Sequence, residues 1–342
     1  MPESARTAVA LLCPGQGAQA IEMGMKWANA SSSARSIITK ADLILADEFD
    51  YPLSEIMWEG PKELLDRTDI AQPAIYVASV ASWHALRQTG ADWETAACAG
   101  LSLGEYTALH IAGVFDFETG LKLVAERGWL MQQAAEAQGG GMVALIGAEE
   151  ADAQAICDEA GGDWVLVCAN FNAPGQIVLS GRLDACKRAE ELAVEHGFRA
   201  QALAVAGAFH SPLMKSAADG LEDALDDIEF QPPKVPVWSN VTGKPHDPEN
   251  MELLKRRLVQ QVVEPVRWSQ GCLDMIAALR GEKTGENPDS ESDVPAELPR
   301  ATQSPTIHHQ QVEFHELAPG SVLRGLMRRI DRNVKVTSHD EP

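Results

Sequence analysis

The feature that most constrains the fold is a glycine-flanked serine between a strand-like run and a helical pattern at residues 95–115. The small residues "TAACAG" (95–100) predict a short buried strand, and "GEYTALHIAGVF" (104–115) predicts a helix that begins right after Ser102. Gly100 and Gly104 allow the backbone to turn back sharply, which leaves the Ser102 hydroxyl exposed as a nucleophile. The alternative is a tight turn in which Ser102 merely caps the helix.

Further strands and helices alternate around this turn. We expect a first strand at 8–13, a helix at 18–28 and a longer helix at 73–90, all before the strand at 95–100. A strand at 312–320 and a basic helix at 321–334 close the chain. This alternation is typical of a parallel sheet that is covered by helices on both faces.

Residues 139–205 show a different, compact pattern with the element order β-α-β-β-α-β and a glycine at nearly every boundary. That order is the ferredoxin-like arrangement. We therefore predict an α/β fold with two subdomains. Residues 1–136 and 208–342 form a parallel-sheet, α/β-hydrolase-like large subdomain, and residues 137–207 form an inserted ferredoxin-like small subdomain.

Composition excludes several classes of function. The chain has 342 residues, of which 45% are hydrophobic, enough for a sizeable core, and its net charge of −22 disfavours nucleic acid as a partner. The first apolar run (7–15) is too short to span a membrane and lacks a cleavage site. The six cysteines have no C-x-x-C spacing, which favours reduced thiols in a cytoplasmic protein and no zinc site. We also expect a monomer.

Residues 281–311 lose apolar periodicity and become rich in acidic residues, proline and serine. Such a composition predicts a solvated, flexible surface insert. His308 and His309 lie in it, but two adjacent histidines without further ligands indicate a solvated loop rather than a metal site.

A serine nucleophile needs a base, and His210 is the best-placed candidate. It follows the last strand of the small unit and lies in an apolar run that ends at a Ser-Pro pair. Position alone leaves two readings open, a packed structural histidine or a base held at the subdomain junction. His110, two turns into the helix after Ser102, is expected to point away from the hydroxyl.

Arg127 is the third informative residue, because it projects from the apolar stripe of the helical segment 120–138 rather than from its polar face. A guanidinium in that position needs an anion. The partner is either a structural carboxylate or the carboxylate of a bound substrate, held by two parallel hydrogen bonds.

With these residues in place, the chain resembles the malonyl-CoA:acyl carrier protein transacylases over nearly its whole length. The resemblance rests on short motifs that follow one another in the family's order. They are "PGQGAQ" (14–19), "AQPAIYVASVA" (71–81), "GLSLGEYTAL" (100–109), "ERGWLMQ" (126–132), "ANFNAPGQIVLSG" (169–181), "FHSPLM" (209–214) and "PVRW" (265–268).

The resemblance implies a role for each matching residue. Ser102 corresponds to the nucleophile, His210 to the general base, and Arg127 to the arginine that grips the malonyl carboxylate. The backbone N–H groups of Gln16 and Leu103 correspond to the oxyanion hole. The backbone carbonyl of Gln261 corresponds to the group that orients the histidine, so no triad aspartate is expected; Asn170 and Gln176 match polar positions near the cleft.

The implied reaction is a ping-pong transfer of malonyl from malonyl-CoA, through a malonyl-serine ester, to the phosphopantetheine thiol of acyl carrier protein for fatty acid synthesis. It needs no metal and no cofactor besides the thioester substrate and the carrier's own prosthetic group. The alternatives are a related acyltransferase of polyketide or specialised lipid synthesis, a serine thioesterase or hydrolase, and a non-catalytic module that binds the carrier protein.

Leu101 stands next to the nucleophile, where many family members carry histidine, so we count it among the substrate-binding positions and expect it to influence selectivity. Carrier proteins of this kind are acidic, so a docking surface on this acidic chain must be locally basic. The candidates are "KRR" (255–257) and the helix with Arg324, Arg328, Arg329 and Arg332, with solvated helix faces as the alternative.

Overall fold

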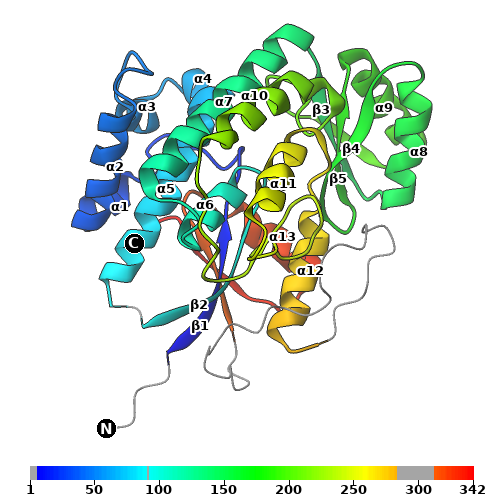
Figure 1. Ribbon diagram of the computed structural model, residues 1–342. Coiled ribbons are helices and arrows are strands. Elements are labelled where there is room, and N and C mark those ends of the chain that lie inside the picture. The colour runs from blue at the N-terminus through cyan, green and yellow to red at the C-terminus, as the bar shows by residue number, and fades with distance from the viewer. Residues whose placement is uncertain (1–5, 91, 283–311) are drawn as a thin grey trace.

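The computed structural model describes residues 6–90, 92–282 and 312–342. Its larger sheet has five strands, all parallel, in the order β7-β2-β1-β8-β9, and the neighbours β1 and β2 are labelled in Figure 1. The strands are β1 (Thr7–Cys13), β2 (Trp93–Gly100), β7 (Val237–Trp238), β8 (Glu313–Leu317) and β9 (Val336–His339). The predicted α/β fold with a parallel sheet is confirmed.

Helices cover both faces of this sheet, and β1 shows why. Val9, Leu11 and Cys13 belong to the core cluster shared with helices α5, α6 and α7. Ala10 and Leu12 belong to a second cluster, with residues of α12 and α13. Because successive side chains of a strand point to opposite faces, a strand between two helical layers is apolar at every position.

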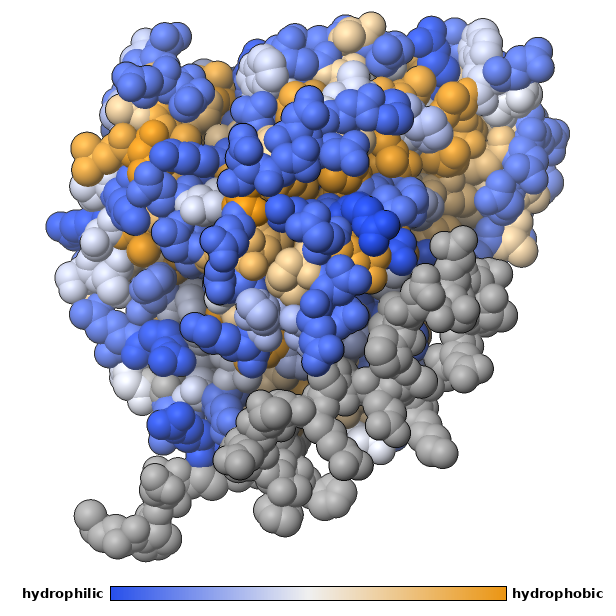
Figure 2. Space-filling view, in the orientation of Figure 1, coloured by the Kyte–Doolittle hydropathy of each residue, from blue (hydrophilic) through white to orange (hydrophobic). Residues whose placement is uncertain are grey.

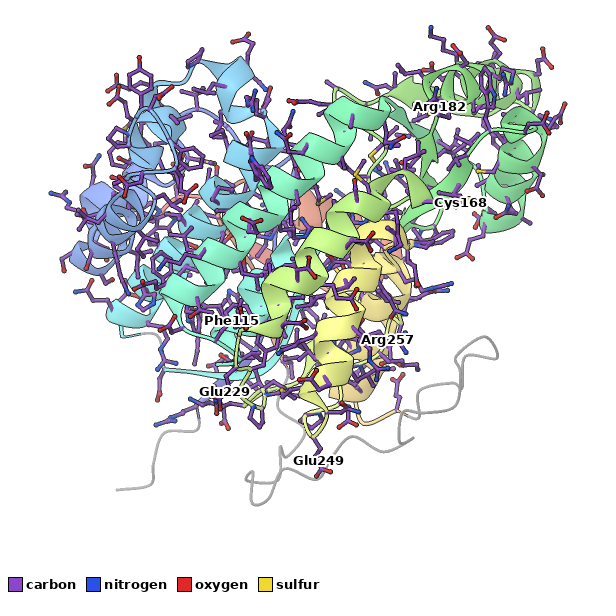
Figure 3. All side chains as sticks on the ribbon, turned by 45° about the horizontal axis from the view of Figure 1, so that its top comes forward. Phe115, Cys168, Arg182, Glu229, Glu249 and Arg257 are labelled. Carbon is purple, nitrogen blue, oxygen red and sulfur yellow. The ribbon has the colours of Figure 1, made fainter. Side chains whose placement is uncertain are left out.

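The helices that build these layers contact one another along much of their length. In the view of Figure 3, α7, α10 and α11 lie side by side, and the contacts between elements agree. The helices outside the smaller sheet's unit are α1 (Met25–Ala30), α2 (Ser32–Ile44), α3 (Leu53–Glu59), α4 (Lys62–Leu65), α5 (Thr68–Gln88), α6 (Gly104–Ile111), α7 (Phe117–Gln138), α10 (Lys215–Asp226), α11 (Met251–Val263), α12 (Trp268–Leu279) and α13 (Val322–Ile330), with a short 3₁₀ turn at Pro212–Met214.

Two predicted helices differ from the observed ones. The helix expected at 18–28 is the short α1, which begins at Met25, because Gly24 before it has a left-handed backbone (φ 73°). The helix expected to start at Pro73 begins at Thr68, whose N–H donates to the side chain of Gln132 on α7 (3.1 Å). That start depends on a tertiary contact, which a local pattern does not contain.

Residues 141–202 form a four-stranded antiparallel sheet with the strand order β4-β5-β3-β6. The elements follow as β3 (Gly141–Ile146), α8 (Glu150–Gly161), β4 (Leu166–Ala173), β5 (Gln176–Gly181), α9 (Leu183–Glu195) and β6 (Arg199–Ala202). They enclose a separate apolar core. A parallel bridge between Asn170 of β4 and Val266 joins this unit to the rest of the chain.

The face drawn in Figure 2 is mostly hydrophilic, with apolar residues gathered in smaller patches between the polar ones. No helix in the described ranges is long and apolar enough to cross a membrane. The acidic insert expected at 281–311, with His308 and His309, lies outside the described residues from position 283 onward.

The turn after β2 is the most tightly packed backbone near the sheet. A Cβ on Gly100 would lie 1.9 Å from main-chain atoms of Gly104, and a Cβ on Gly104 would lie 2.1 Å from the Cys13 carbonyl oxygen. Cys13 and Gly100 are also register partners at the carboxyl ends of β1 and β2. The glycines are therefore required because three backbone segments meet with no room for a side chain.

We predict that Gly100→Ala lowers the free energy of unfolding by about 3 kcal/mol or more, because backbone atoms rather than flexible side chains must move. Gly325→Ala in α13 is the matched control, because no atom lies within 4 Å of its added Cβ. The control should be neutral or stabilising by about 0.5 kcal/mol, since alanine reduces the entropy of the unfolded chain. Urea unfolding measures both; equal stability of the two variants would contradict the prediction.

Candidate active site

Ser102 lies at the tip of the turn between β2 and α6 and has a left-handed backbone (φ 51°), unusual for a residue other than glycine. The first turn of α6 forms right behind it, since Glu105 N–H donates to the Ser102 carbonyl at 3.0 Å. The Ser102 N–H donates to Asn240 Oδ1 (2.6 Å), and Asn240 Nδ2 donates back to the Gly100 carbonyl (2.7 Å). The Asn240 amide thus fixes the strained turn from both sides.

His210 is the partner of Ser102, with 2.9 Å between Ser102 Oγ and His210 Nε2. It lies in the loop after β6, also with a left-handed backbone (φ 56°), and is 4% exposed. His110, by contrast, donates from Nδ1 to the Phe115 carbonyl (3.1 Å), away from Ser102. Of the two histidines considered from the sequence, the structure brings only His210 to the serine.

The other ring nitrogen of His210 is oriented by a main-chain carbonyl. His210 Nδ1 donates to the Gln261 carbonyl at 2.6 Å. That carbonyl lies in the last turn of α11, and its helical partner would be the N–H of residue 265, which is a proline. The Gln261 carbonyl is therefore free to bind His210, and it fixes the tautomer in which Nε2 accepts the serine proton.

Burial, together with the positive charge of Arg127, lowers the pKa of His210 to about 4. The imidazole is therefore neutral at pH 7. A neutral histidine within hydrogen-bond distance of a hydroxyl is the state that a general base requires. The negative end of the α11 dipole, at the Gln261 carbonyl, favours the imidazolium that forms when the proton is taken.

Arg127 projects from α7 into the same site and is 1% exposed. Its terminal nitrogens donate to Ser102 Oγ (3.1 Å), to Gln261 Oε1 (2.9 Å) and to Gln72 Oε1 (2.5 Å). Its Nε–H has no acceptor within the described part of the chain. Among the described residues no carboxylate forms an ion pair with this guanidinium, so it is a buried cation that faces the nucleophile with uncharged partners only.

Gln16 and Leu103 both lie beside Ser102. Leu103 follows the serine directly and is buried, and Gln16 belongs to the turn at 14–19 that packs on the elbow, where a Cβ on Gly15 would lie 2.2 Å from the Leu101 carbonyl oxygen. Within the described part of the chain neither backbone N–H donates a hydrogen bond. Two free donors next to a nucleophile are suited to binding an oxyanion.

The remaining sequence-based candidates are Leu101, which directly precedes the serine, and Asn170 and Gln176 of the smaller sheet. Leu101 is half-buried and packs against the cluster formed by α12 and α13. Asn170 is half-buried on β4 beside Val266, and Gln176 begins β5 at the hairpin. Neither polar side chain has a hydrogen bond to Ser102, His210 or Arg127 among the contacts of the described residues.

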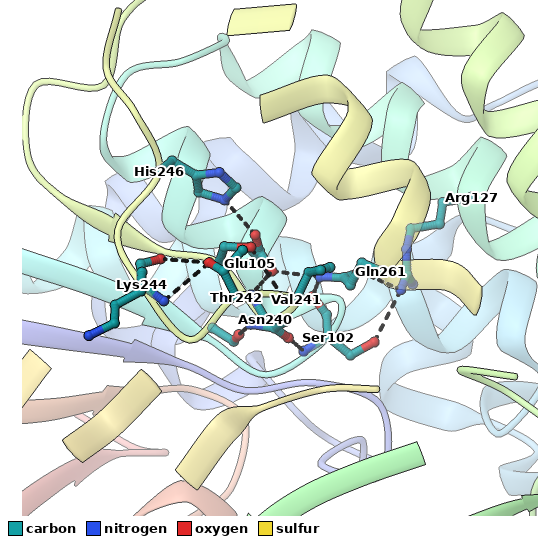
Figure 4. A network of polar contacts seen from close by, with 11 residues as sticks. Ser102, Glu105, Arg127, Asn240, Val241, Thr242, Lys244, His246 and Gln261 are labelled. Atoms are coloured by element: carbon teal, nitrogen blue, oxygen red, sulfur yellow. Dashed lines mark hydrogen bonds and ion pairs between the residues drawn. The ribbon is translucent and has the colours of Figure 1, made fainter. Parts of the chain in front are cut away.

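Sequence reasoning missed four buried polar residues that support the site: Gln72, Glu105, Asn240 and His246, of which Figure 4 labels the last three. Gln72 lies inside the family-like motif at 71–81 and Glu105 inside the one at 100–109. Their positions in these motifs could have identified them as candidates for the site. Asn240 and His246 follow the two-residue strand β7, which no periodicity reveals. Elsewhere in the described ranges, no group of three or more His, Cys, Asp or Glu side chains could hold a metal ion.

The geometry combines a serine hydrogen-bonded to a neutral histidine, two backbone N–H groups beside it and a buried cation one hydrogen bond from the hydroxyl, an arrangement that suits acyl transfer from an acid-bearing substrate. The comparisons agree with this class. Residues 10–283 match the model of the acyl transferase domain. The protein is an acyltransferase.

The relatives define the family more narrowly. The chain is 33% identical to the malonyl CoA-acyl carrier protein transacylase of Bacillus subtilis, over 98% of this chain and 94% of the relative. The crystal structure of the transacylase from Xanthomonas oryzae matches with a TM-score of 0.83 and 35% identity, over 99% of this chain and 96% of that one. The chain belongs to the malonyl CoA-acyl carrier protein transacylases, which confirms the resemblance seen in the sequence.

A third comparison concerns a partner. A malonyl-transacylase solved in complex with the acyl carrier protein of a type II polyketide synthase matches with a TM-score of 0.83 and 32% identity. The match covers 98% of this chain and 97% of that one.

We predict that Ser102 keeps its reactivity far into the acid range, because the base is lost only as the pH falls through the depressed pKa of His210, about 4. At pH 5 about 90% of His210 stays neutral, against about 3% for an ordinary histidine, a contrast of about thirtyfold. The rate of Ser102 labelling by a fluorophosphonate measures this, with circular dichroism to verify folding and His210→Ala as the unreactive control. A midpoint near pH 6.5 would contradict the prediction.

Proposed function

We propose that this chain transfers the malonyl group from malonyl-CoA to the phosphopantetheine thiol of acyl carrier protein for fatty acid synthesis. The observation that carries the proposal is the buried Arg127, whose guanidinium lies 3.1 Å from the hydroxyl of the Ser102–His210 pair without a carboxylate partner. Such a cation selects an acyl group that ends in a carboxylate.

In the first half-reaction Ser102 Oγ attacks the thioester carbonyl while its proton moves to His210 Nε2. The tetrahedral oxyanion accepts hydrogen bonds from the backbone N–H groups of Gln16 and Leu103. The C–S bond then breaks, the coenzyme A thiolate takes the proton from His210, and a malonyl-Ser102 ester remains.

The second half-reaction runs the same steps in reverse with a different thiol. The phosphopantetheine thiol gives its proton to His210 and attacks the ester carbonyl, and the Ser102 oxygen leaves with that proton. The Gln261 carbonyl holds the imidazole in one orientation through both halves. All proton transfers use one ring nitrogen, so the mechanism needs no metal and no cofactor of its own.

Substrate binding changes the charge that acts on His210. The positive charge of Arg127 is one of the two causes that lower the pKa of His210. A malonyl carboxylate on Arg127 neutralises that charge and raises the basicity of the imidazole. Binding of the acid-bearing substrate and activation of the serine are therefore coupled.

The proposal also covers the division into subdomains, the lining of the substrate cleft, the location of the protein and its oligomeric state. We assign residues 137–207 to a ferredoxin-like subdomain inserted into an α/β-hydrolase-like one (1–136 and 208–342), supported by the separate core of the smaller sheet. Leu101, Asn170 and Gln176 are assigned to the substrate cleft from the family motifs. A cytoplasmic location is supported by the six free cysteines, and we expect a monomer.

A carrier-protein surface is proposed on "KRR" (255–257) or on α13. The three basic residues lie on α11, about 6 to 9 Å along the axis from Gln261, and Arg257 of this set is labelled in Figure 3. Arg324, Arg328, Arg329 and Arg332 are all exposed on or just after α13. Solvated helix faces are the alternative for both sets.

The proposal predicts an isolable intermediate. With labelled malonyl-CoA, mass spectrometry should find malonyl on Ser102, and added holo carrier protein should remove it; Ser102→Ala should carry no label. The absence of any acyl-enzyme would overturn the proposal, and loss of label to water would indicate a hydrolase instead. Faster transfer to a polyketide carrier protein than to a fatty acid carrier protein would indicate a role in polyketide synthesis. The solved complex of a similar transacylase contains a carrier protein of that kind.

Arg127→Ala should lower the preference for malonyl-CoA over acetyl-CoA by on the order of 10- to 100-fold, the range of charge-assisted hydrogen bonds. Acetyl transfer should be spared or should rise, because no buried cation remains unpaired. Arg182→Ala is the control, since that arginine donates to the Gln138 carbonyl at the edge of the smaller sheet's unit. Full malonyl preference in Arg127→Ala would show that another group binds the carboxylate.

A further inference from the structure

Glu105 is a buried carboxylate, 1% exposed, in the first turn of α6, three residues after the nucleophile. Three donors meet it, two from the loop after β7 and one from α11 (Figure 4). They are His246 Nε2 (2.6 Å), the Asn240 backbone N–H (3.0 Å) and Gln261 Nε2 (2.7 Å). A carboxylate so fully satisfied is held rigidly, and it sits at the favourable end of the helix dipole.

The contact with Gln261 sets the orientation of that side-chain amide. A carboxylate accepts hydrogen bonds only, so it requires the NH₂ end of the amide, and Nε2 also donates to the Ser102 carbonyl at 3.1 Å. The oxygen end then faces Arg127, which donates to it at 2.9 Å. Because the guanidinium has no acceptor, the reverse orientation would place donor against donor.

The negative charge of Glu105 also affects the pKa of Arg127, although the two side chains do not contact each other directly. Burial lowers the pKa of Arg127, and Tyr106 and, to a smaller extent, the negative charge of Glu105 oppose that shift. The amide of Gln261 stands between the two charged groups. A carboxylate in direct contact would occupy the guanidinium, whereas one placed behind an amide stabilises the cation and leaves it open to a ligand.

We propose that Glu105 is a positioning residue for substrate selection. Its carboxylate fixes the Gln261 amide so that a neutral oxygen, rather than an anion, holds Arg127 beside Ser102. His246 and Asn240 keep Glu105 in place, and Gln261 carries its effect to the guanidinium. This inference rests on the proposed malonyl transfer and assigns its selectivity to a residue that does not touch the substrate.

The test compares the loading of Ser102 from labelled malonyl-CoA and acetyl-CoA in Glu105→Gln, which keeps the shape and removes the charge. A glutamine at position 105 can donate from its own NH₂ group to the Gln261 side chain. The Gln261 amide is then no longer held in one orientation. The malonyl-to-acetyl ratio should fall at least about tenfold, the effect of one charge-assisted hydrogen bond. An unchanged ratio, or an equal loss of both activities, would overturn the inference.

Thr107→Val is the matched control on the same helix, because Thr107 is fully buried and its hydroxyl has no hydrogen-bond partner among the residues that the structure describes. It should leave the ratio unchanged. If Glu105→Gln does not fold, Gln261→Met tests the same link, since it removes the amide and keeps the backbone carbonyl that binds His210. The ratio should fall in this variant too, and an unchanged ratio would equally overturn the inference.

The wild-type enzyme separates the proposed function from the role of Glu105. If wild-type Ser102 takes no malonyl, the proposed function itself fails. If the wild type loads malonyl selectively and Glu105→Gln does so with the same ratio, only the role of Glu105 fails.

Discussion

The close contact of Gly100, Gly104 and the Cys13 carbonyl is the constraint on which the site depends. Three backbone segments meet there, so the chain can only reverse at Ser102 and start α6 at the carboxyl ends of β1 and β2. That reversal exposes the hydroxyl and leaves the N–H of Leu103 free. The other groups of the site come to this fixed point from elsewhere: His210 from a loop, Arg127 from α7 and Gln261 from α11.

Placing a cation at this point requires a particular set of neighbours. A buried arginine is destabilising unless its charge is compensated, yet a directly bound carboxylate would close it to a ligand. Arg127 instead has amide and hydroxyl oxygens around it, with the Glu105 carboxylate one amide farther away. Burial and the same charge keep His210 neutral, so one residue both faces the Ser102 hydroxyl as a cation and influences the protonation state of the neighbouring histidine.

The sequence predicted the parts of this structure that local pattern controls. The strand at 95–100, the helix after Ser102, and the projection of Arg127 from an apolar stripe follow from glycine spacing and periodicity, and the family resemblance was carried by short motifs. The two-residue β7 and the start of α5 were not predictable, because one is too short for a pattern and the other depends on Gln132. Asn240 and His246 were missed for the same reason as β7.

The proline at position 265 has a consequence for how this site can change. Gln261 presents its main-chain oxygen to His210 because Pro265 has no N–H to claim it. A triad aspartate can be lost by a single substitution or neutralised by acid. A peptide carbonyl remains when the side chain is changed, and it does not titrate in this pH range. Because the carbonyl belongs to the main chain, it is present whatever the side chain at position 261. A substitution scan at that position therefore does not detect the role of the carbonyl in orienting the imidazole. The residue that keeps this carbonyl free is Pro265, one helical turn farther along the chain.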